Sequence, residues 1–232
     1  MEIMTLVIAG VFSLISLYIG IKSLTGYLAA SKNHVNTFYW GLSFIFMFFG
    51  YILSIVYQTI APADMMRPLA NILRMLENFV AWFQLLAVAY STLWCPRYDT
   101  PSCRRCKFCF KKLKWDIPIV LCIVTTVVGQ FISDLGFENT SILNGVNIYY
   151  AFVHLIVLGV IIYLLLKSTN FESGLAVAYV GIWLNNLLMI VSLVLPKRVE
   201  TNIQIVGVGL MQVSAALLFY EVLKLFSKER RK

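Results

Sequence analysis

Long apolar segments alternate with short polar segments along the whole chain, and this pattern predicts helices that cross a membrane. An α-helix needs about 20 apolar residues to cross roughly 30 Å of hydrocarbon, whereas the strands of a membrane barrel alternate over about 10 residues. The apolar segments of this chain have the length of helices. We assign seven spans, at Ile3–Ile21, Phe38–Tyr57, Pro68–Leu93, Ile117–Ile132, Val146–Leu166, Gly174–Leu195 and Ile203–Phe226.

The composition agrees with a membrane protein. Hydrophobic residues make up 60% of the 232 positions and charged residues only 13%, compared with roughly 45–50% and about 25% in soluble domains. No internal repeat is evident in the sequence. We therefore expect residues 1–232 to form one all-α, seven-helix transmembrane domain of the cell membrane, with no attached soluble effector.

The lysine and arginine residues of short loops indicate how membrane helices are oriented. Most of them fall in the loop 94–116 and after the seventh helix, which lie on the same side of the membrane. We therefore expect the N-terminus outside and the C-terminus in the cytoplasm. This topology, with attraction to anionic lipid head groups, also explains the net charge of +8. A nucleic-acid partner is not expected.

The third predicted helix carries charged and amide side chains inside an apolar segment. Arg74 and Glu77 lie one turn apart, roughly 9–14 Å from the outer end of the helix at about 1.5 Å per residue. Spacings of three and four place the polar residues of this helix on one stripe. Polar residues of helices five, six and seven come out at a similar depth, roughly 12–14 Å. The predicted polar centre consists of Arg74, Glu77, Asn78, Gln84, His154, Asn186 and Gln212.

Two interpretations of this centre are open. It could be structural, with an internal Arg74–Glu77 pair and amide side chains that hydrogen-bond between helices. It could also bind a small molecule or relay a proton, because ionisable groups inside a membrane usually mark functional sites. The shared depth favours the second interpretation. Arg74 would then hold an anionic group or pair with Glu77, Glu77 would accept or relay a proton, and the amides would orient a ligand.

Four cysteines lie in the predicted cytoplasmic loop 94–116, and their thiolates could hold a zinc ion or an iron–sulfur cluster. Zinc sites usually use two separated pairs of cysteines, whereas three of these four are crowded together. S-acylation beside the membrane, or ordinary reduced thiols facing the cytoplasm, would explain the cluster without a metal. The candidate ligands are Cys95, Cys103, Cys106 and Cys109.

The segment 38–94 resembles part of the seven-helix sensor modules found at the N-termini of prokaryotic histidine kinases. The similarity covers an aromatic-rich second helix and the charged third helix. It rests on Trp40, Gly50, Tyr51, Arg74, Glu77 and Trp82. The resemblance implies a sensor that signals through a separate cytoplasmic or membrane partner.

We predict a ligand-sensing or ligand-binding membrane protein whose ligand the sequence does not identify. One alternative is a small-solute or ion transporter that uses the same centre. Another is a structural or assembly subunit of a membrane complex, in which the centre only joins helices. Catalytic motifs are missing from the sequence. We therefore do not expect an enzyme, although Glu77 and His154 leave acid–base catalysis open.

Overall fold

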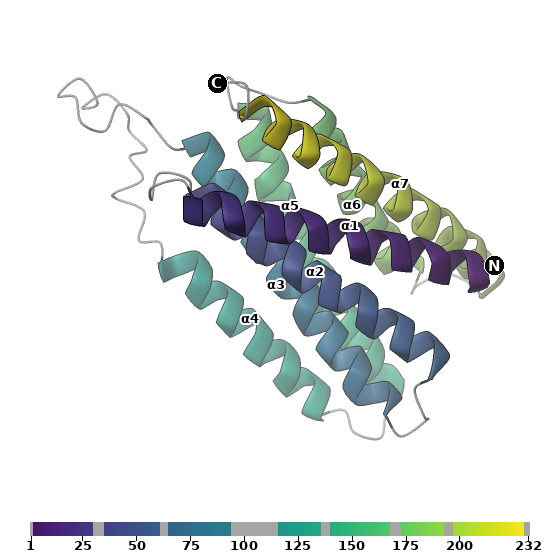
Figure 1. Ribbon diagram of the computed structural model, residues 1–232. Coiled ribbons are helices and arrows are strands. Elements are labelled where there is room, and N and C mark those ends of the chain that lie inside the picture. Colours follow the sequence, from purple (N-terminus) through teal and green to yellow (C-terminus); the bar gives the residue numbers. More distant parts are fainter. Residues whose placement is uncertain are drawn as a thin grey trace.

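Seven α-helices make up the part of the chain that the computed structural model describes, which is residues 2–29, 35–60, 65–93, 116–135, 140–167, 173–192 and 197–229. Each helix occurs at one of the predicted apolar segments (Figure 1). The helices are α1 (Glu2–Ala29), α2 (Val35–Thr59), α3 (Met66–Leu93), α4 (Asp116–Leu135), α5 (Thr140–Lys167), α6 (Ser173–Ser192) and α7 (Lys197–Glu229).

Several helices extend beyond the apolar segments that predicted them. α1 continues to Ala29, α5 begins at Thr140, and α7 runs from Lys197 to Glu229. Hydropathy marks only the residues suited to hydrocarbon, whereas backbone hydrogen bonding continues a helix for as long as its groups can pair. The apolar pattern therefore locates each helix but underestimates the length of these three.

Six of the described helices are long and apolar enough to cross a membrane. The apolar part of α4 is shorter, at Pro118–Ile132. Its exposed side chains are nevertheless large and apolar, among them Val124, Val127 and Phe131. Exposed apolar surface of this kind suits lipid and not water. The molecule is thus an all-α protein whose helices indicate several membrane crossings, and a seventh crossing by α4 stays a prediction.

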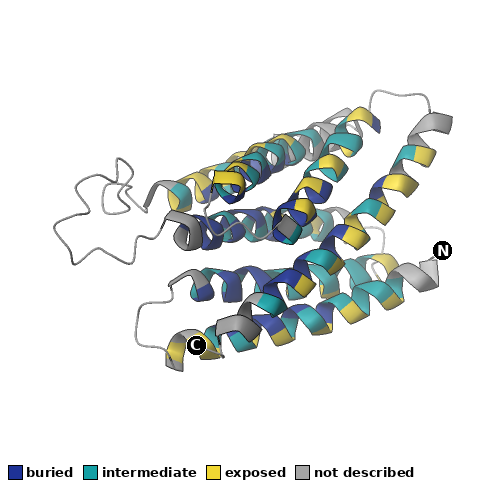
Figure 2. Ribbon diagram, turned by 90° about the horizontal axis from the view of Figure 1, so that it is seen from above, coloured by how far each residue is buried: buried dark blue, intermediate teal, exposed yellow. Residues whose placement is uncertain are grey.

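Six helices follow one another around the bundle in the order α1, α2, α3, α5, α6 and α7, and α7 also contacts α1. α4 packs against α3 and α5, at the edge of the bundle (Figure 1). The start of α1 and the end of α7 lie at opposite ends of the molecule. Buried residues lie along the sides on which the helices face one another, as Figure 2 shows.

Aromatic side chains fill the part of the core between α1, α2 and α7. The Phe219 ring lies 5.7 Å from that of Phe44 and 5.2 Å from that of Phe12, measured between ring centroids. Aromatic pairs at this separation stabilise a core beyond the area they bury. Through the Phe219 ring, these contacts join α7 to both α1 and α2.

α6 and α7 approach each other closely because glycines of α6 face polar side chains of α7. A Cβ atom at Gly181 would overlap the Ser214 hydroxyl, and one at Gly174 would overlap the Glu221 carboxylate. Small residues allow helices in membranes to pack at short range. The pairing fixes α6, which carries one of the candidate site residues, against the rest of the bundle.

Candidate functional site

Most of the candidate residues lie on α3, which is the most buried of the six apolar spans. Pro68 stands in its first turn, where a proline removes no helical hydrogen bond. Beyond it, polar residues occur on more than one face of the helix. Glu77 and Asn78, for example, are neighbours in the chain and therefore point in directions about 100° apart.

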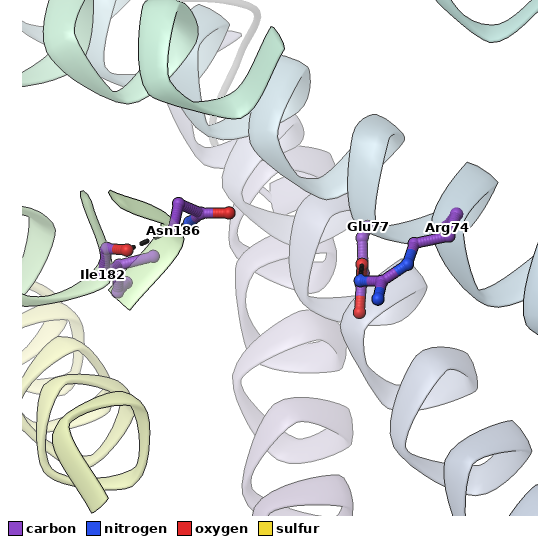
Figure 3. Close-up of polar contacts among 4 residues, drawn as sticks. All are labelled: Arg74, Glu77, Ile182 and Asn186. Carbon is purple, nitrogen blue, oxygen red and sulfur yellow. Dashed lines mark hydrogen bonds and ion pairs between the residues drawn. The ribbon is translucent and has the colours of Figure 1, made fainter. Parts of the chain in front are cut away.

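Arg74 and Glu77 form an ion pair on α3. The Arg74 Nη1 atom donates a hydrogen bond to Glu77 Oε2 at 2.7 Å, as drawn in Figure 3. The side chains keep 32% and 48% of their surface accessible, respectively. A hydrogen bond between two charged groups at this distance is among the stronger ones in proteins. The pair that the spacing of three allowed as one interpretation is therefore present, and both of its side chains keep accessible surface.

Side chains of α2 and α5 lie within electrostatic range of this ion pair. The imidazole of His154, on α5, lies within electrostatic range of Arg74 and Glu77 and contacts the Asn186 side chain of α6. On α2, Tyr51 lies within range of Glu77. Groups of α2 and α5 therefore lie close enough to this ion pair to interact with it electrostatically.

His154 and Asn186 each present a polar atom to this space. The Asn186 Nδ2 group donates to the Ile182 carbonyl oxygen at 3.0 Å, which leaves its side-chain oxygen directed to the side where the α3 pair lies (Figure 3). His154 is buried, and its Nε2 atom has no hydrogen-bond partner among the described residues. A buried polar atom without a partner costs about 1–3 kcal/mol. Water or a polar ligand at this position would remove that cost.

Gln84 belongs to the same interior but lies further along α3. Its side-chain oxygen accepts a hydrogen bond from the Tyr179 hydroxyl at 3.3 Å. Its Nε2 atom is buried without a partner in the described part of the chain, as is the indole nitrogen of Trp82. The interior of the bundle thus offers additional hydrogen-bond donors beyond the ion pair.

Asn78 points away from the ion pair and holds α4 against α3. Its Nδ2 group donates to the hydroxyls of Thr126 at 2.9 Å and Thr125 at 3.1 Å. The Tyr149 hydroxyl donates to the Thr125 backbone oxygen at 2.9 Å and so connects α5 to the same place. These bonds between helices are what a structural role requires.

Gln212 also lies apart from the ion pair. It borders a groove of about 290 Å³ between α7 and α1, among apolar side chains that include Val11 and Phe12. Depth along the helix was the only basis for including Gln212 in the centre, and depth does not specify which neighbour a side chain faces. The structure therefore brings Arg74, Glu77, His154 and Asn186 together, with Gln84 in the same interior.

A second ion pair was not predicted from the sequence. Glu221 Oε2 lies 3.3 Å from Lys224 Nζ on α7, and the Glu221 side chain is only 7% accessible whereas that of Lys224 is 40% accessible. The carboxylate rests on Gly174, in the first turn of α6. One signal was available, because a glutamate within an apolar helix three residues before a lysine is costly unless it is paired.

The cysteine cluster lies outside the described residues, so the structure does not test Cys95, Cys103, Cys106 or Cys109 as metal ligands. Within the described ranges, no group of three or more His, Cys, Asp or Glu side chains could hold a metal ion. Cys122 is buried in α4 beside Thr126. It occupies a small apolar position against the bundle, as is typical of a buried thiol.

Comparisons with protein families, with curated proteins and with solved structures find no match to this chain.

Proposed function

We propose that this protein binds a small polar ligand at the centre formed by Arg74, Glu77, His154 and Asn186, and that it acts as a membrane sensor. The observation that carries the proposal is the accessible ion pair of α3, which lies within electrostatic range of side chains of α2 and α5. Charged groups within a membrane protein are costly and usually serve a function. Access for a polar molecule distinguishes this pair from a purely structural one.

The orientation proposed from the basic residues places this centre in the outer half of the bundle. α3 would start at the outer surface, and Arg74 and Glu77 lie in its third and fourth turns. An odd number of crossings would leave the two chain ends on opposite sides, and the start of α1 and the end of α7 lie at opposite ends of the bundle. We therefore propose seven crossings, with the ligand arriving from outside.

Comparison of this centre with the polar contacts between α3 and α4 supports the proposal that it binds a ligand. The Nδ2 group of Asn78 is engaged with two threonine hydroxyls. The centre has the opposite character, because Glu77 remains half accessible and the buried His154 Nε2 atom has no partner among the described residues. Hydrogen bonding between helices explains the contacts of Asn78. It does not explain the accessible Glu77 carboxylate or the buried His154 Nε2 atom.

Ligand binding can be tested by thermal unfolding of the full-length protein in lipid nanodiscs against a panel of small polar metabolites. A ligand at 100 times its Kd stabilises the folded state by about 2.7 kcal/mol. We expect at least one compound to raise the Tm of the wild type and of a control variant, Lys167→Gln, but not that of Glu77→Gln. The proposal is contradicted if no compound does so, or if Glu77→Gln responds like the wild type.

A transporter would use the same centre, and measured flux separates it from a sensor. The compound found in the nanodisc experiment would be radiolabelled and its uptake followed in proteoliposomes. A sensor predicts no uptake above that of empty liposomes. Uptake that is lost in Glu77→Gln would instead establish transport.

A further inference from the structure

The outward faces of α1 and α7 carry the same pattern of residues. Two apolar residues, a tyrosine and a lysine follow one another at spacings of three, four and four, which keeps all of them on one face of a helix. The start of α1 and the end of α7 lie at opposite ends of the molecule, so the two helices run in the same direction (Figure 1). They also contact each other. The two faces consist of Val11, Leu14, Tyr18 and Lys22 on α1, and of Val213, Ala216, Tyr220 and Lys224 on α7.

The tyrosine and the lysine of each face form a pair. Lys22 Nζ lies 5.4 Å from the centroid of the Tyr18 ring, and Lys224 Nζ lies 6.0 Å from that of Tyr220. Both tyrosines are exposed. Lys224 also pairs with the buried Glu221 at 3.3 Å, and the lysine side chain stays 40% accessible. Because an ammonium group has three N–H donors, these contacts are compatible with donation to a further acceptor.

The groove between α1 and α7 lies on the same two faces. Val11, Val213 and Ala216 are among the apolar side chains that line its volume of about 290 Å³. At about 1.5 Å per residue, Ala216 is roughly 12 Å from Lys224 along α7, and Val11 is roughly 17 Å from Lys22 along α1. The hydrocarbon of one leaflet is about 15 Å thick, which is half of roughly 30 Å. An apolar groove and two lysines are therefore separated by about the depth of one leaflet.

A phospholipid has the chemistry that this arrangement requires. Its acyl chain is apolar, and its phosphate accepts hydrogen bonds from ammonium and hydroxyl groups. Lysines near a membrane surface also attract anionic lipids. A second copy of the chain on the same face would bring its own lysines close to these, and like charges at an interface disfavour association. The charges thus favour an anionic lipid over a second copy.

α5 carries a tyrosine–lysine pair that provides a comparison. Lys167 Nζ lies 5.5 Å from the centroid of the Tyr163 ring and donates a hydrogen bond to its hydroxyl at 3.3 Å. α5 packs against α3, α4 and α6, so this pair is not on the face shared by α1 and α7. A single pair of this kind is ordinary at the boundary of a membrane. Two such pairs on neighbouring helices, below one groove, are what distinguish the α1–α7 face.

We propose that the α1–α7 face binds one anionic phospholipid. The phosphate accepts hydrogen bonds from Lys22 and Lys224, with the two tyrosine hydroxyls as further donors. One acyl chain follows the apolar residues of both faces and ends in the groove. In the orientation proposed above, the lipid belongs to the cytoplasmic leaflet. This site is separate from the centre on α3, and its occupant does not depend on the proposed function.

The test measures which lipid the full-length protein retains. The protein is reconstituted in vesicles of equal parts phosphatidylcholine and phosphatidylglycerol, extracted in mild detergent, and analysed by native mass spectrometry. We expect the wild type to retain one phosphatidylglycerol in preference to phosphatidylcholine. Lys22→Gln should retain roughly fivefold less, which is the factor for one lysine near an anionic surface. Lys22 is the position chosen because Lys224 also supports the buried Glu221.

Lys167→Gln is the matched control, because it removes a lysine from the same kind of pair on α5. It should retain phosphatidylglycerol like the wild type. Equal losses in the two lysine variants would show only a general attraction of basic residues to anionic lipid, and would overturn the proposal. Equal retention of the two lipids, or release of a lipid-free dimer, would also overturn it.

A second pair of variants tests the groove without changing a charge. Ala216→Phe places a ring in the groove, whereas Val206→Phe changes an exposed residue of α7 that does not line it. We expect less retained phosphatidylglycerol in Ala216→Phe than in Val206→Phe, with both variants unfolding at the temperature of the wild type. Equal retention in these two variants would contradict the path assigned to the acyl chain.

Discussion

The two ion pairs found among the described residues have the same spacing along a helix but lie in different environments. Glu77 pairs with Arg74 at 2.7 Å and keeps 48% of its side chain accessible, whereas Glu221 pairs with Lys224 at 3.3 Å and keeps only 7%. Glu77 lies within electrostatic range of His154 on α5, and Glu221 lies against Gly174 of α6. The tighter and more accessible pair is the one suited to meet a ligand, and the buried carboxylate is the one suited to hold two helices together.

The position of Glu221 explains why a buried carboxylate is tolerated there. It lies against the first turn of α6, where unpaired backbone N–H groups and the helix dipole favour a negative charge. Lys224 provides a partly exposed counter-charge. A carboxylate with these two partners contributes to stability, and its role requires no exchange with solvent.

The largest loss of stability is expected for Gly174→Ala, which should disrupt the contact between the Glu221 carboxylate and α6. The added Cβ atom would displace the buried Glu221 carboxylate from the first turn of α6, and a buried polar group that loses its partners costs about 1–3 kcal/mol. Thermal unfolding in nanodiscs measures the loss. The matched control is Gly50→Ala, because a Cβ atom at Gly50 meets nothing within 4 Å. A loss of similar size in both variants would show that Gly174 has no special packing role.

A smaller effect is expected for Asn78→Ala, which tests whether polar residues on the α4 side of α3 are structural. The variant removes two interhelical hydrogen bonds, each worth about 0.6 kcal/mol in a membrane protein, so we expect a loss of about 1 kcal/mol. Thr126→Val should cost about half as much because it removes one of them. Ligand binding should survive in both. Loss of binding without a change in Tm would place Asn78 in the ligand site instead.

The smallest effect on stability is expected for Glu77→Gln, although its effect on binding is the largest. Ion pairs that remain accessible contribute about 0–1 kcal/mol, so the Tm without ligand should change little. Unfolding measured with and without the stabilising compound separates the two quantities. A ligand-free loss similar to that of Gly174→Ala would show that the pair holds the bundle together.

The sequence predicted the helices well because hydrocarbon imposes a length and a composition that are visible in the letters. It also allowed an Arg74–Glu77 pair as one of two interpretations, since a spacing of three brings side chains together on a helix. What it could not predict was the neighbour of each polar side chain. Asn78 faces α4 although it adjoins Glu77, and Gln212 faces α1 although its depth matches that of His154. Those outcomes depend on which helices pack together.

Glu221 was missed for a related reason. It lies near the end of an apolar helix among basic residues, where a charged side chain is expected at the membrane surface. Its burial comes from α6, whose Gly174 leaves room for the carboxylate. The burial of Glu221 is determined by the contact between α6 and α7, and the sequence of α7 alone does not reveal it.

The central claim, that polar molecules reach the ion pair of α3, is tested most directly by thiol labelling. Glu77→Cys would be placed in a variant without the native cysteines and treated in proteoliposomes with a charged, membrane-impermeant thiosulfonate. Val124→Cys on α4 is the control, because Val124 is exposed to a similar extent, 47%, on an apolar face. The account predicts rapid labelling at position 77 and little at position 124. No labelling at position 77, in protein whose unfolding temperature matches that of the parent, would contradict it.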